Sequence, residues 1–271
     1  MADCIVIAVD GPSGSGKSSA ARGAARALGL RYLDTGAMYR ALTWWMLDRE
    51  LEVSDAAAVA AHTGQPVIEV GTDPGQPWVS VDGTDVSSPI RERPVSNAVS
   101  SVASVPEVRS RLIAQQRAII ARACAEVGGI VAEGRDIGTV VAPEAGVKVF
   151  LTAAASARAQ RRAADLVSDP VVTVELTQAE QARRDRLDAA QSGRAQDAVA
   201  IDSTALSLAE VIDAIVALAQ AGPIASPAAQ TTFAAPAPFG SPAAPISPAP
   251  QAPLAGNPVP RQSGADPAWR S

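Results

Sequence analysis

Histidine is almost absent from this sequence, which contains one histidine among 271 residues. That residue, His62, lies in an alanine-rich stretch, and we expect it to be structural or to lie at the surface. The sequence therefore gives no support to chemistry built on a histidine base, such as that of a Ser-His-Asp triad. Any catalytic site in this chain has to rely on other groups.

Cysteine is nearly as scarce, since the chain has two, Cys4 and Cys124. Both lie in apolar surroundings, and they are far apart in the sequence. We therefore expect two buried thiols in a reducing compartment. A disulfide between them is the alternative that the sequence leaves open.

Long apolar runs and an excess of positive charge are missing too. The sequence predicts no transmembrane helix, because it has no apolar run of about 18 residues or more. Its first apolar run, Cys4–Val9, follows Asp3 directly and is too short for a signal peptide. The formal net charge of −5 argues against general nucleic-acid binding, although it allows a local basic pocket for a nucleotide. We expect a cytoplasmic monomer with neither a membrane nor nucleic acid as a partner.

The end of the chain lacks large apolar side chains. From about Gly222 onward it consists mostly of alanine, proline, serine, glutamine and glycine, and its only charges are Arg261, Asp266 and Arg270. This composition does not offset the entropy of ordering, so residues 221–271 are predicted to be a disordered Pro/Ala-rich tail. We expect an inert extension; a partner-binding arm of polyproline-like conformation is the alternative.

Residues 1–220 alternate between strand and helix patterns. Buried strands are predicted where apolar, often β-branched residues run together, at Cys4–Val9, Ile130–Ala132, Val147–Leu151 and Ala198–Ile201. Helical spacing of apolar residues predicts helices at Lys17–Leu28, Ala37–Leu51, Val105–Ala125, Ala155–Asp165, Gln178–Leu187 and Leu208–Ala219. This order predicts an α/β fold in which helices cover both faces of a parallel sheet.

One stretch, Val67–Val86, breaks this alternation. It contains short β patterns on either side of Gly71 and an Asp82-Gly83 pair that is typical of hairpin turns. Short antiparallel strands are therefore predicted here, within a small insert of about residues 64–104. The core of the domain is then formed by about residues 1–60 and 126–220.

The most specific local motif lies between a predicted strand and a predicted helix. It is Gly11-Pro12-Ser13-Gly14-Ser15-Gly16-Lys17-Ser18, which matches G-x-x-x-x-G-K-[ST]. In such a loop, backbone N–H groups point at phosphate oxygens and the helix N-terminus adds partial positive charge. We expect these residues and Ser19 to bind ATP, with Lys17 at the β- and γ-phosphates and the Ser18 hydroxyl on Mg²⁺.

Four blocks, taken in order, resemble the bacterial cytidylate kinase family, and the resemblance runs from about Ile5 to Ala219. The blocks are Val9–Gly14, Leu33–Arg40, Glu133–Thr139 and Asp197–Thr204. The antiparallel stretch lies where this family carries its enlarged monophosphate-binding insert. The resemblance implies a P-loop kinase: a three-layer α/β sandwich with an NMP-binding insert and a helical lid. Such an enzyme moves a phosphoryl group from ATP, bound with Mg²⁺, to CMP or dCMP.

Two candidate acceptor residues follow a short apolar strand. Thr35 precedes a predicted helix, whose N-terminus favours an anion, and Arg40 lies one turn into it, where a guanidinium can bind a phosphate. Locally, a helix cap for Thr35 and a solvated charge for Arg40 are the alternatives. The resemblance implies that both bind the acceptor.

The resemblance also implies a pocket around the acceptor monophosphate and its base. Arg91, Ser100 and Arg109 would line it, and Asp136 would join Ser100 and Arg109 at the cytosine edge. A carboxylate can accept from the amino group of cytosine, while a guanidinium and a hydroxyl can donate to N3 and O2. Taken by themselves, the three insert residues are equally compatible with a polar surface.

Arginines are concentrated on the two predicted helices of residues 155–165 and 178–187. The six are Arg158, Arg161, Arg162, Arg183, Arg184 and Arg186. This favours a lid that closes over phosphates, with a solvated helix face as the alternative. We expect Arg158 and Arg162 to be catalytic together with Lys17 and Arg135, which follows a buried strand. By the family pattern, Arg184 and Asp188 contact the sugar of the acceptor.

The sequence departs from the family at two places. Gln191 stands where the family usually has a further arginine, and Arg194 is the candidate to replace it, after a segment about four residues shorter. If nothing replaces it, we expect weaker CMP binding or slower transfer. Glu133 stands where the family often has aspartate, a change that keeps the charge and is expected to matter little.

Two other functions remain compatible with the phosphate loop alone. One is a kinase for another small acceptor; a hydroxyl acceptor would require a carboxylate base, for which Asp34 is the candidate. The other is a nucleotide-dependent regulatory or binding protein that uses the tail as its arm. The predicted insert argues against the first alternative.

Overall fold

The computed structural model describes residues 4–165, 174–189 and 192–222, without the side chains of residues 162–165 and 174–177. The chain divides into two compact units, Met1–Ala235 and Pro236–Ser271, and the second lies wholly outside the described residues. The predicted tail of residues 221–271 therefore falls almost entirely outside them. Every element described below belongs to the first unit.

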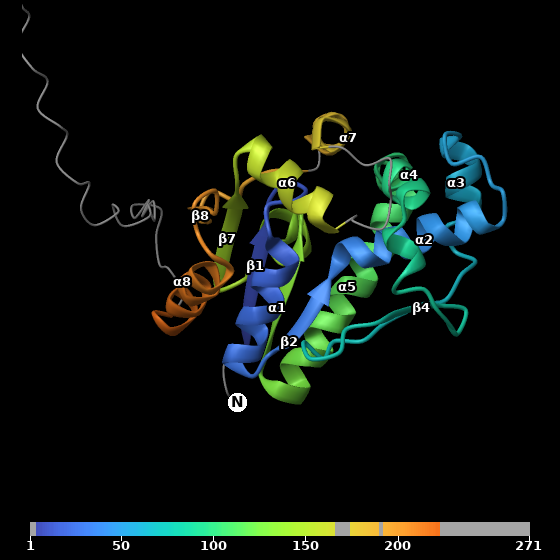
Figure 1. Ribbon diagram of the computed structural model, residues 1–271. Coiled ribbons are helices and arrows are strands. Elements are labelled where there is room, and N and C mark those ends of the chain that lie inside the picture. Colours follow the sequence, from blue (N-terminus) through green and yellow to red (C-terminus); the bar gives the residue numbers. More distant parts are fainter. Residues whose placement is uncertain (1–3, 166–173, 190–191, 223–271) are drawn as a thin grey trace, which may run out of the picture. The chain divides into compact units, whose positions relative to one another are not determined.

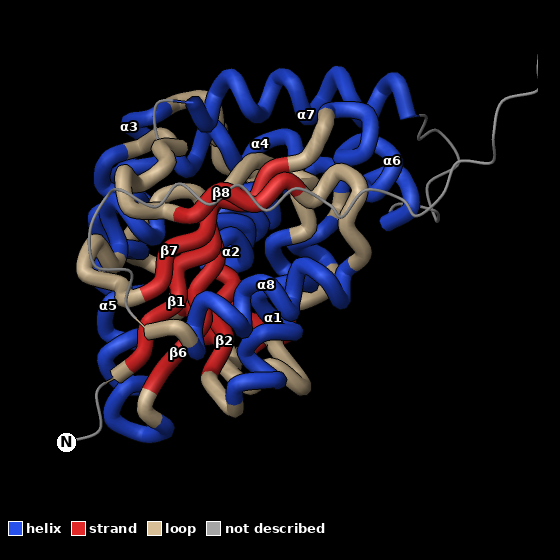
Figure 2. The backbone as a smooth tube through the Cα atoms, turned by 90° about the vertical axis from the view of Figure 1, so that its left-hand side faces the viewer, coloured by secondary structure: helices blue, strands red, loops and turns tan. Residues whose placement is uncertain are grey.

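The centre of the described structure is a five-stranded parallel sheet with the order β2-β6-β1-β7-β8, which Figure 2 shows in red. Its side chains Ile7, Val131 and Leu151 are buried, because helices cover both faces of the sheet. This explains why the strand sequences are apolar without alternation, and it confirms the predicted parallel sheet. The strands are β1 (Ile5–Asp10), β2 (Arg31–Asp34), β6 (Gly129–Gly134), β7 (Val147–Thr152) and β8 (Val199–Asp202).

Helices pack on both faces of this sheet (Figure 1). On one face, α1 (Lys17–Leu28) and α8 (Leu208–Gln220) share a core with β1 and β7, to which α8 contributes Val211 and Ile215. On the other, α2 (Thr35–Asp48) and α5 (Pro106–Val127) share a second core through Met38, Leu42 and Leu112. The result is the predicted three-layer α/β sandwich.

The insert between α2 and α5 contains a small antiparallel sheet, as predicted. Its strands are β3 (Ile68–Val70), β4 (Val79–Val81) and β5 (Thr84–Asp85), paired in the order β3-β4-β5. Asp82 and Gly83 connect β4 to β5 with φ angles of 51° and 80°, as a type I′ hairpin turn requires. The Asp-Gly turn is therefore confirmed.

Helical elements of the insert region were not predicted. They are α3 (Ala56–His62), the 3-10 helix η1 (Pro89–Arg91) and α4 (Arg93–Ala103). His62 ends α3 with its Nδ1 2.7 Å from the carbonyl oxygen of Ala58, which agrees with the expected structural role. The remaining described elements are the π-helical segment η2 (Ile137–Val141), α6 (Ala155–Asp165) and α7 (Val174–Asp188). Among the described residues, no helix has the length and apolar character that a membrane crossing requires.

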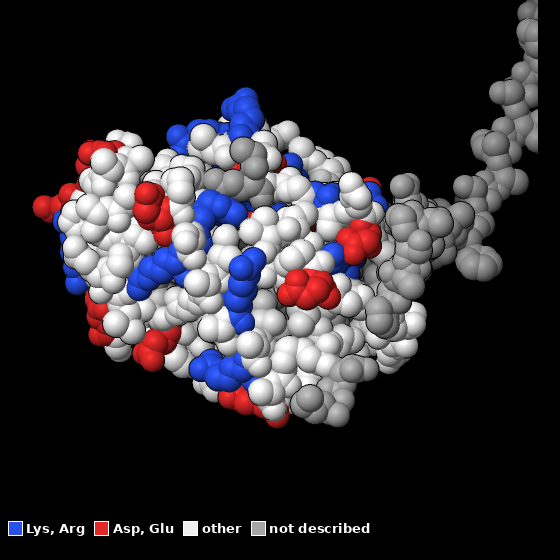
Figure 3. Space-filling view, turned by 180° about the vertical axis from the view of Figure 1, so that it is seen from behind, with Lys and Arg blue, Asp and Glu red and all other residues white. Residues whose placement is uncertain are grey.

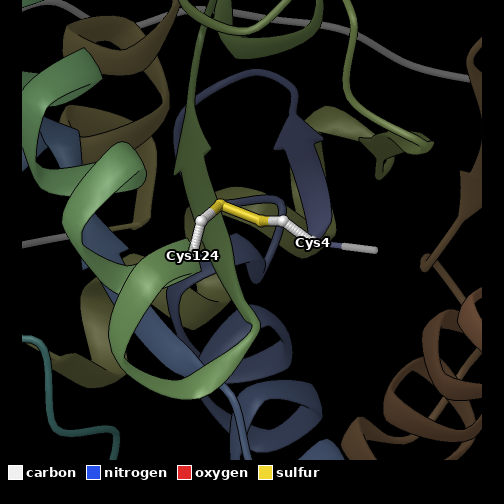
Figure 4. The surroundings of a disulfide bond; sticks show 2 residues. All are labelled: Cys4 and Cys124. Atoms are coloured by element: carbon white, nitrogen blue, oxygen red, sulfur yellow. A yellow bond between two sulfur atoms is a disulfide. The ribbon is translucent and has the colours of Figure 1, made fainter. Parts of the chain in front are cut away.

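The expectation of two free thiols is wrong, because Cys4 and Cys124 form a disulfide (Figure 4). Cys4 immediately precedes β1, and Cys124 lies in the last turn of α5, which leads through Gly128 into β6. Strands β1 and β6 are neighbours, so the end of α5 lies beside the start of β1. Apolar surroundings suit a disulfide as well as two thiols, and they gave no sign that residues 120 positions apart would meet.

Candidate active site

A large cleft of about 990 Å³ lies at the carboxyl ends of the central strands, where open parallel sheets bind their ligands. Its wall combines the loop after β1, the segment after β6, the start of α2, parts of the insert and α7. The predicted site residues that line it are Ser13–Ser19, Thr35, Arg40, Arg91, Ser100, Arg109, Arg135, Asp136, Arg184 and Asp188. Gly11, Pro12 and Arg158 do not line it but contact residues that do. The side chain of Arg162 lies outside the described residues.

The loop between β1 and α1 is folded around one of its own carbonyl groups. Ser15 Oγ and Lys17 Nζ both donate to the carbonyl oxygen of Pro12, at 3.0 and 2.8 Å. Gly14 and Gly16 have φ angles of 76° and 90°, which only glycine adopts without strain. The loop leads directly into α1, whose first N–H groups have no partner within the helix and are available to an anion.

A buried carboxylate lies behind Lys17. Glu133, near the end of β6, is 3% exposed and accepts a hydrogen bond from Tyr32 Oη at 2.6 Å. Burial lowers the pKa of Lys17 and raises the pKa of Glu133, and their opposite charges offset part of both shifts. The cation and the carboxylate therefore support each other's charge inside the protein.

Sequence reasoning missed this network. It treated Glu133 as an equivalent of aspartate and did not identify Tyr32, although both side chains line the cleft. One feature of the sequence could have pointed to Tyr32: it lies on the short strand that leads to Asp34 and Thr35. That this strand pairs with β6, and so places Tyr32 near Glu133, was clear only from the structure.

The oxygens beside Lys17 suit a magnesium ion. Within the described part of the chain, no group of three or more His, Cys, Asp or Glu side chains forms a metal cage. Mg²⁺ in kinases is usually held by one or two protein oxygens together with phosphate and water. The Ser18 hydroxyl and the Glu133 carboxylate, which line the same cleft, provide such oxygens, so they fit Mg²⁺ that arrives with a nucleotide.

Asp10, the last residue of β1, fixes the segment that follows β6. Its two carboxylate oxygens accept hydrogen bonds from the backbone N–H groups of Ile137 and Gly138, both at 2.8 Å. Burial nevertheless raises the pKa of Asp10 to about 6. Because η2 directly follows Arg135 and Asp136, this buried carboxylate determines where those two side chains enter the cleft.

A polar cluster lies on the insert side of the cleft. Asp136 forms an ion pair with Arg109 of α5, and Asp136 is 7% exposed. Ser100 of α4 lies in the same wall, and its buried hydroxyl has no hydrogen-bond partner among the described residues. A buried hydroxyl without a partner costs stability unless a ligand completes it. Tyr39, which sequence reasoning did not single out, also lines this side.

The cap interpretation of Thr35 is wrong. The N-cap of α2 is Asp34, whose Oδ1 accepts from the backbone N–H of Ala37 at 2.9 Å. Thr35 is the first residue of the helix, and its hydroxyl donates to the carbonyl oxygen of Glu133 at 2.7 Å. This bond ties the start of α2 to the end of β6 and leaves Thr35 in the wall of the cleft.

The interpretation of Arg40 as a solvated charge is wrong as well. Its Nη1 donates to the carbonyl oxygen of Ile90 at 3.1 Å and to Ser96 Oγ at 2.8 Å, so it joins α2 to the insert. Arg91 is more accessible: its side chain is 60% exposed and lies 3.7 Å from Oδ2 of Asp34. Both arginines border the cleft.

Carboxylates of α7 hold two of the predicted catalytic arginines. Arg135 Nε pairs with Asp188 Oδ2 at 2.9 Å. Arg158 Nη1 pairs with Asp185 Oδ2 at 2.7 Å and also donates to the carbonyl oxygen of Ser13 at 3.0 Å. The positive charge beside the phosphate loop is thus balanced by acidic residues of the predicted lid.

Comparison with known proteins decides the family. A family model described as "Cytidylate kinase" matches residues 7–221. The chain belongs to the cytidylate kinase family. Cytidylate kinases of Streptomyces avermitilis, Streptomyces coelicolor and Streptococcus pneumoniae are 46%, 48% and 42% identical to it; the matches cover 80%, 81% and 80% of this chain and 93%, 94% and 97% of those proteins.

Solved structures add less to this cytidylate kinase assignment. TT1252 from Thermus thermophilus and a shikimate kinase from Acinetobacter baumannii in complex with shikimate are 17% and 13% identical to the chain. They cover 79% and 81% of it, and it covers 97% and 93% of them, with TM-scores of 0.39 and 0.38.

The expected departure from the family pattern at the end of the predicted lid lies only partly within the described residues. Gln191 lies outside the described residues. Arg194 is described, but its Nε and Nη2 donate to the carbonyl oxygen of Ala198 at 3.1 and 2.8 Å, and it does not line the cleft. In this structure Arg194 therefore contacts the backbone of its own segment, and its proposed role as a substitute phosphate contact stays a prediction.

Proposed function

We propose that this protein transfers the γ-phosphoryl group of ATP to CMP or dCMP, giving ADP and CDP or dCDP. One observation carries the proposal beyond the family match. The same cleft is lined by residues 13–19 of the phosphate-binding motif and, on its insert side, by Ser100 with the Arg109–Asp136 pair. A donor and an acceptor can therefore meet in one space.

The reaction needs no general base from the protein. An oxygen of the acceptor monophosphate attacks the γ-phosphorus of ATP, the bond from that phosphorus to the β,γ-bridging oxygen breaks, and ADP leaves. A monophosphate dianion is already a nucleophile, which agrees with the position of His62 in α3, away from the cleft wall. Catalysis then consists of in-line positioning and neutralisation of charge.

Four cationic residues are proposed to neutralise the transferred group. Lys17 contacts the β- and γ-phosphates, and Arg135, Arg158 and Arg162 close around the phosphoryl group. Arg135 and Arg158 are already beside the loop, since they donate to the carbonyl oxygens of Gly11 and Ser13. Mg²⁺, when bound with ATP at Ser18, adds further charge neutralisation on the phosphate oxygens.

Recognition of the base is assigned to the cluster on the insert side. Asp136 accepts from the amino group of cytosine, while Arg109 and Ser100 donate to N3 and O2. Uracil presents a carbonyl oxygen where cytosine has its amino group, and this oxygen would face a buried carboxylate. The proposal therefore includes discrimination against UMP. Thr35, Arg40 and Arg91 are assigned to the acceptor phosphate, and Arg184 and Asp188 to its sugar.

Neither alternative function gains support. A hydroxyl acceptor would need Asp34 as a base, but Asp34 caps α2 and lies against Arg91. A regulatory protein would not need the acceptor cluster. We further propose a cytoplasmic monomer that binds no nucleic acid, in keeping with its nucleotide substrates and its net charge of −5. In that compartment the Cys4–Cys124 pair is expected to be exposed to thiol reductants.

The test is ADP formation by the purified protein from ATP and Mg²⁺, with CMP, dCMP, UMP, AMP or shikimate offered separately. Rapid turnover with CMP and dCMP, and much slower turnover with the others, is expected. Turnover with UMP or AMP but not CMP would contradict the assignment of the base pocket. Tight ATP binding without turnover of any cytidylate would contradict the proposal as a whole.

A further inference from the structure

We propose that Arg93 and Glu180 form a latch between the insert and the lid, which retains the acceptor nucleotide during turnover. The acceptor named here rests on the proposed function. The latch itself rests on contacts between α4 of the insert and α7 of the predicted lid, two helices that both contribute residues to the wall of the cleft. Figure 1 shows α7 between α6 and α4.

The pair has the geometry of a strong charge-assisted contact. Nε and Nη2 of Arg93 both donate to Oε1 of Glu180, at 3.0 and 2.7 Å. The two side chains are 31% and 29% exposed, so most of the contact is shielded from solvent. The residues are 87 positions apart, and the contact is therefore made only if the lid and the insert come together.

A second contact extends the first along both helices. One turn further on, Nη2 of Arg183 in α7 donates to the carbonyl oxygen of Asn97 in α4 at 3.0 Å. Two contacts one turn apart align the helices, whereas a single surface ion pair would leave them free to pivot.

The other side of α7 contacts the donor site. Gln181 is 4% exposed, and its Nε2 donates to the carbonyl oxygen of Arg158 at 3.2 Å. The same Nε2 lies so close to Gly14 that a Cβ there would meet it. Successive residues of α7 thus contact the phosphate loop through Gln181 and the insert through Glu180.

The position of Arg93 indicates that its charge does not serve its own helix. It is the first residue of α4, where the helix dipole disfavours a cation. The charge is therefore placed for a partner outside α4, and Glu180 is such a partner.

The latch acts on retention and not on the chemical step. Neither Arg93 nor Glu180 lines the cleft, whereas Ser100 of α4 and Arg184 and Asp188 of α7 do. Separating the two helices opens the wall around the acceptor without removing a group that we assign to the reaction. The result should be faster loss of CMP with little change in the rate of transfer.

The first test compares Glu180→Gln, Arg93→Gln, the double variant and the charge exchange Arg93→Glu/Glu180→Arg with Glu144→Gln, a neutralisation of an exposed loop carboxylate. Each single variant should raise the KM and the calorimetric Kd for CMP about fivefold, with kcat within twofold and the Kd for ATP unchanged. The double variant should be no worse than either single one, and the exchange should restore most of the affinity. Additive single effects, or a Kd for CMP unchanged in both, would overturn the latch.

Hydrogen exchange provides a readout that needs no activity. Amides of α7 should exchange several times faster in Glu180→Gln and Arg93→Gln than in the wild-type chain, and the charge exchange should restore protection. Amides of α8 serve as the internal control. Unchanged α7 exchange in both single variants contradicts the latch, whereas a wild-type protein that does not turn over CMP contradicts the proposed function alone.

Discussion

The phosphate loop and the lid helix α7 both border the cleft, but they are held in different ways. The loop is held by bonds to backbone groups and by burial: Lys17 and Ser15 bond to Pro12 within it. Helix α7 is held mainly by side-chain ion pairs, in which Glu180, Asp185 and Asp188 each contact an arginine.

This difference matches two requirements of the reaction: the phosphate loop must be preorganised, whereas α7 must move as nucleotides enter and leave. Backbone bonds of a buried loop persist as long as the fold does, and electrostatic preorganisation of that kind costs nothing during the reaction. Partly exposed ion pairs are worth little individually, so those of Arg135 and Arg158 can be exchanged for contacts with phosphates when nucleotides bind, while the Arg93–Glu180 pair stays in place. We expect substitutions on the loop side to change chemistry or global stability, and substitutions on α7 to change nucleotide exchange.

The largest effect on turnover is expected from a substitution in the phosphate loop, which is the preorganised region. Lys17→Met should lower kcat by about 10² to 10³, because it removes a preorganised cation from the transferred phosphate. Stability should fall as well, because Glu133 is left buried without its cation. Arg122→Met, an exposed residue of α5, is the control and should retain full turnover. Turnover of Lys17→Met within tenfold of the wild type would show that the loop is not the donor site.

The disulfide also belongs to the preorganised part of the molecule, because it joins the start of β1 to α5. Cys4→Ser, or reduction of the wild type, should lower the free energy of unfolding by about 5 kcal/mol, as the chain-entropy relation gives for closure of a loop of this length. Turnover at 25 °C and exchange of α7 should remain unchanged. Denaturation with and without reductant measures the effect, and reductant should not alter Cys4→Ser. A reductant effect on that variant would mean that something other than this bond is responsible.

A substitution in the base pocket should have an effect smaller than one in the phosphate loop and larger than one on α7. Arg109→Met should lower kcat/KM for CMP about a hundredfold, because it removes a donor to the base and leaves Asp136 buried without its cation. Arg117→Met is the matched control: this arginine lies on the same helix but donates to the carbonyl oxygens of Val140 and Val141 outside the cleft. Equal losses in both variants would indicate damage to α5 and not to recognition.

A smaller effect, and one that depends on pH, is expected at Asp10. Burial raises its pKa from 3.8 to about 6, so between these values the folded chain binds a proton that the unfolded chain releases. The contribution of Asp10 to the free energy of unfolding therefore falls as the pH rises from about 4 to about 6, by about 2 kcal/mol. In Asp10→Asn this fall should be missing, so the stability difference between wild type and variant should shrink over the same range. Urea denaturation at several pH values measures it; a difference that grows with pH would contradict the raised pKa.

The helices and strands could be predicted from the sequence wherever a short run of residues determines them. The range of α1 follows from the motif before Lys17 and from Gly29, and the strands of the core follow from apolar runs that need burial on both faces. Helix α4 was missed because its sequence, Arg93–Ala103, mixes serine, asparagine and valine, which are poor helix formers. Packing against α2 and α5 decides its structure instead.

Many residues of the site could be predicted from sequence motifs, but the contacts between residues far apart in the sequence could not. The loop residues could be named from their motif, whereas Arg109 and Asp136 could be named only through the resemblance to the family. Tyr32 with Glu133, and Arg93 with Glu180, are separated by 101 and 87 positions, and no local pattern links them. For the same reason the sequence could not reveal that Cys4 meets Cys124.

That bond also changes the connectivity of the chain. With the two sulfurs joined, everything from Cys4 to Cys124 becomes one covalent ring, which contains the phosphate loop, α2 and the insert up to α5. A single protease cut inside this ring leaves one molecule under oxidising conditions and two fragments after reduction. Nicked protein should therefore run as one band on a non-reducing gel and as two on a reducing gel, with the donor loop and the acceptor insert held together until the sulfurs part.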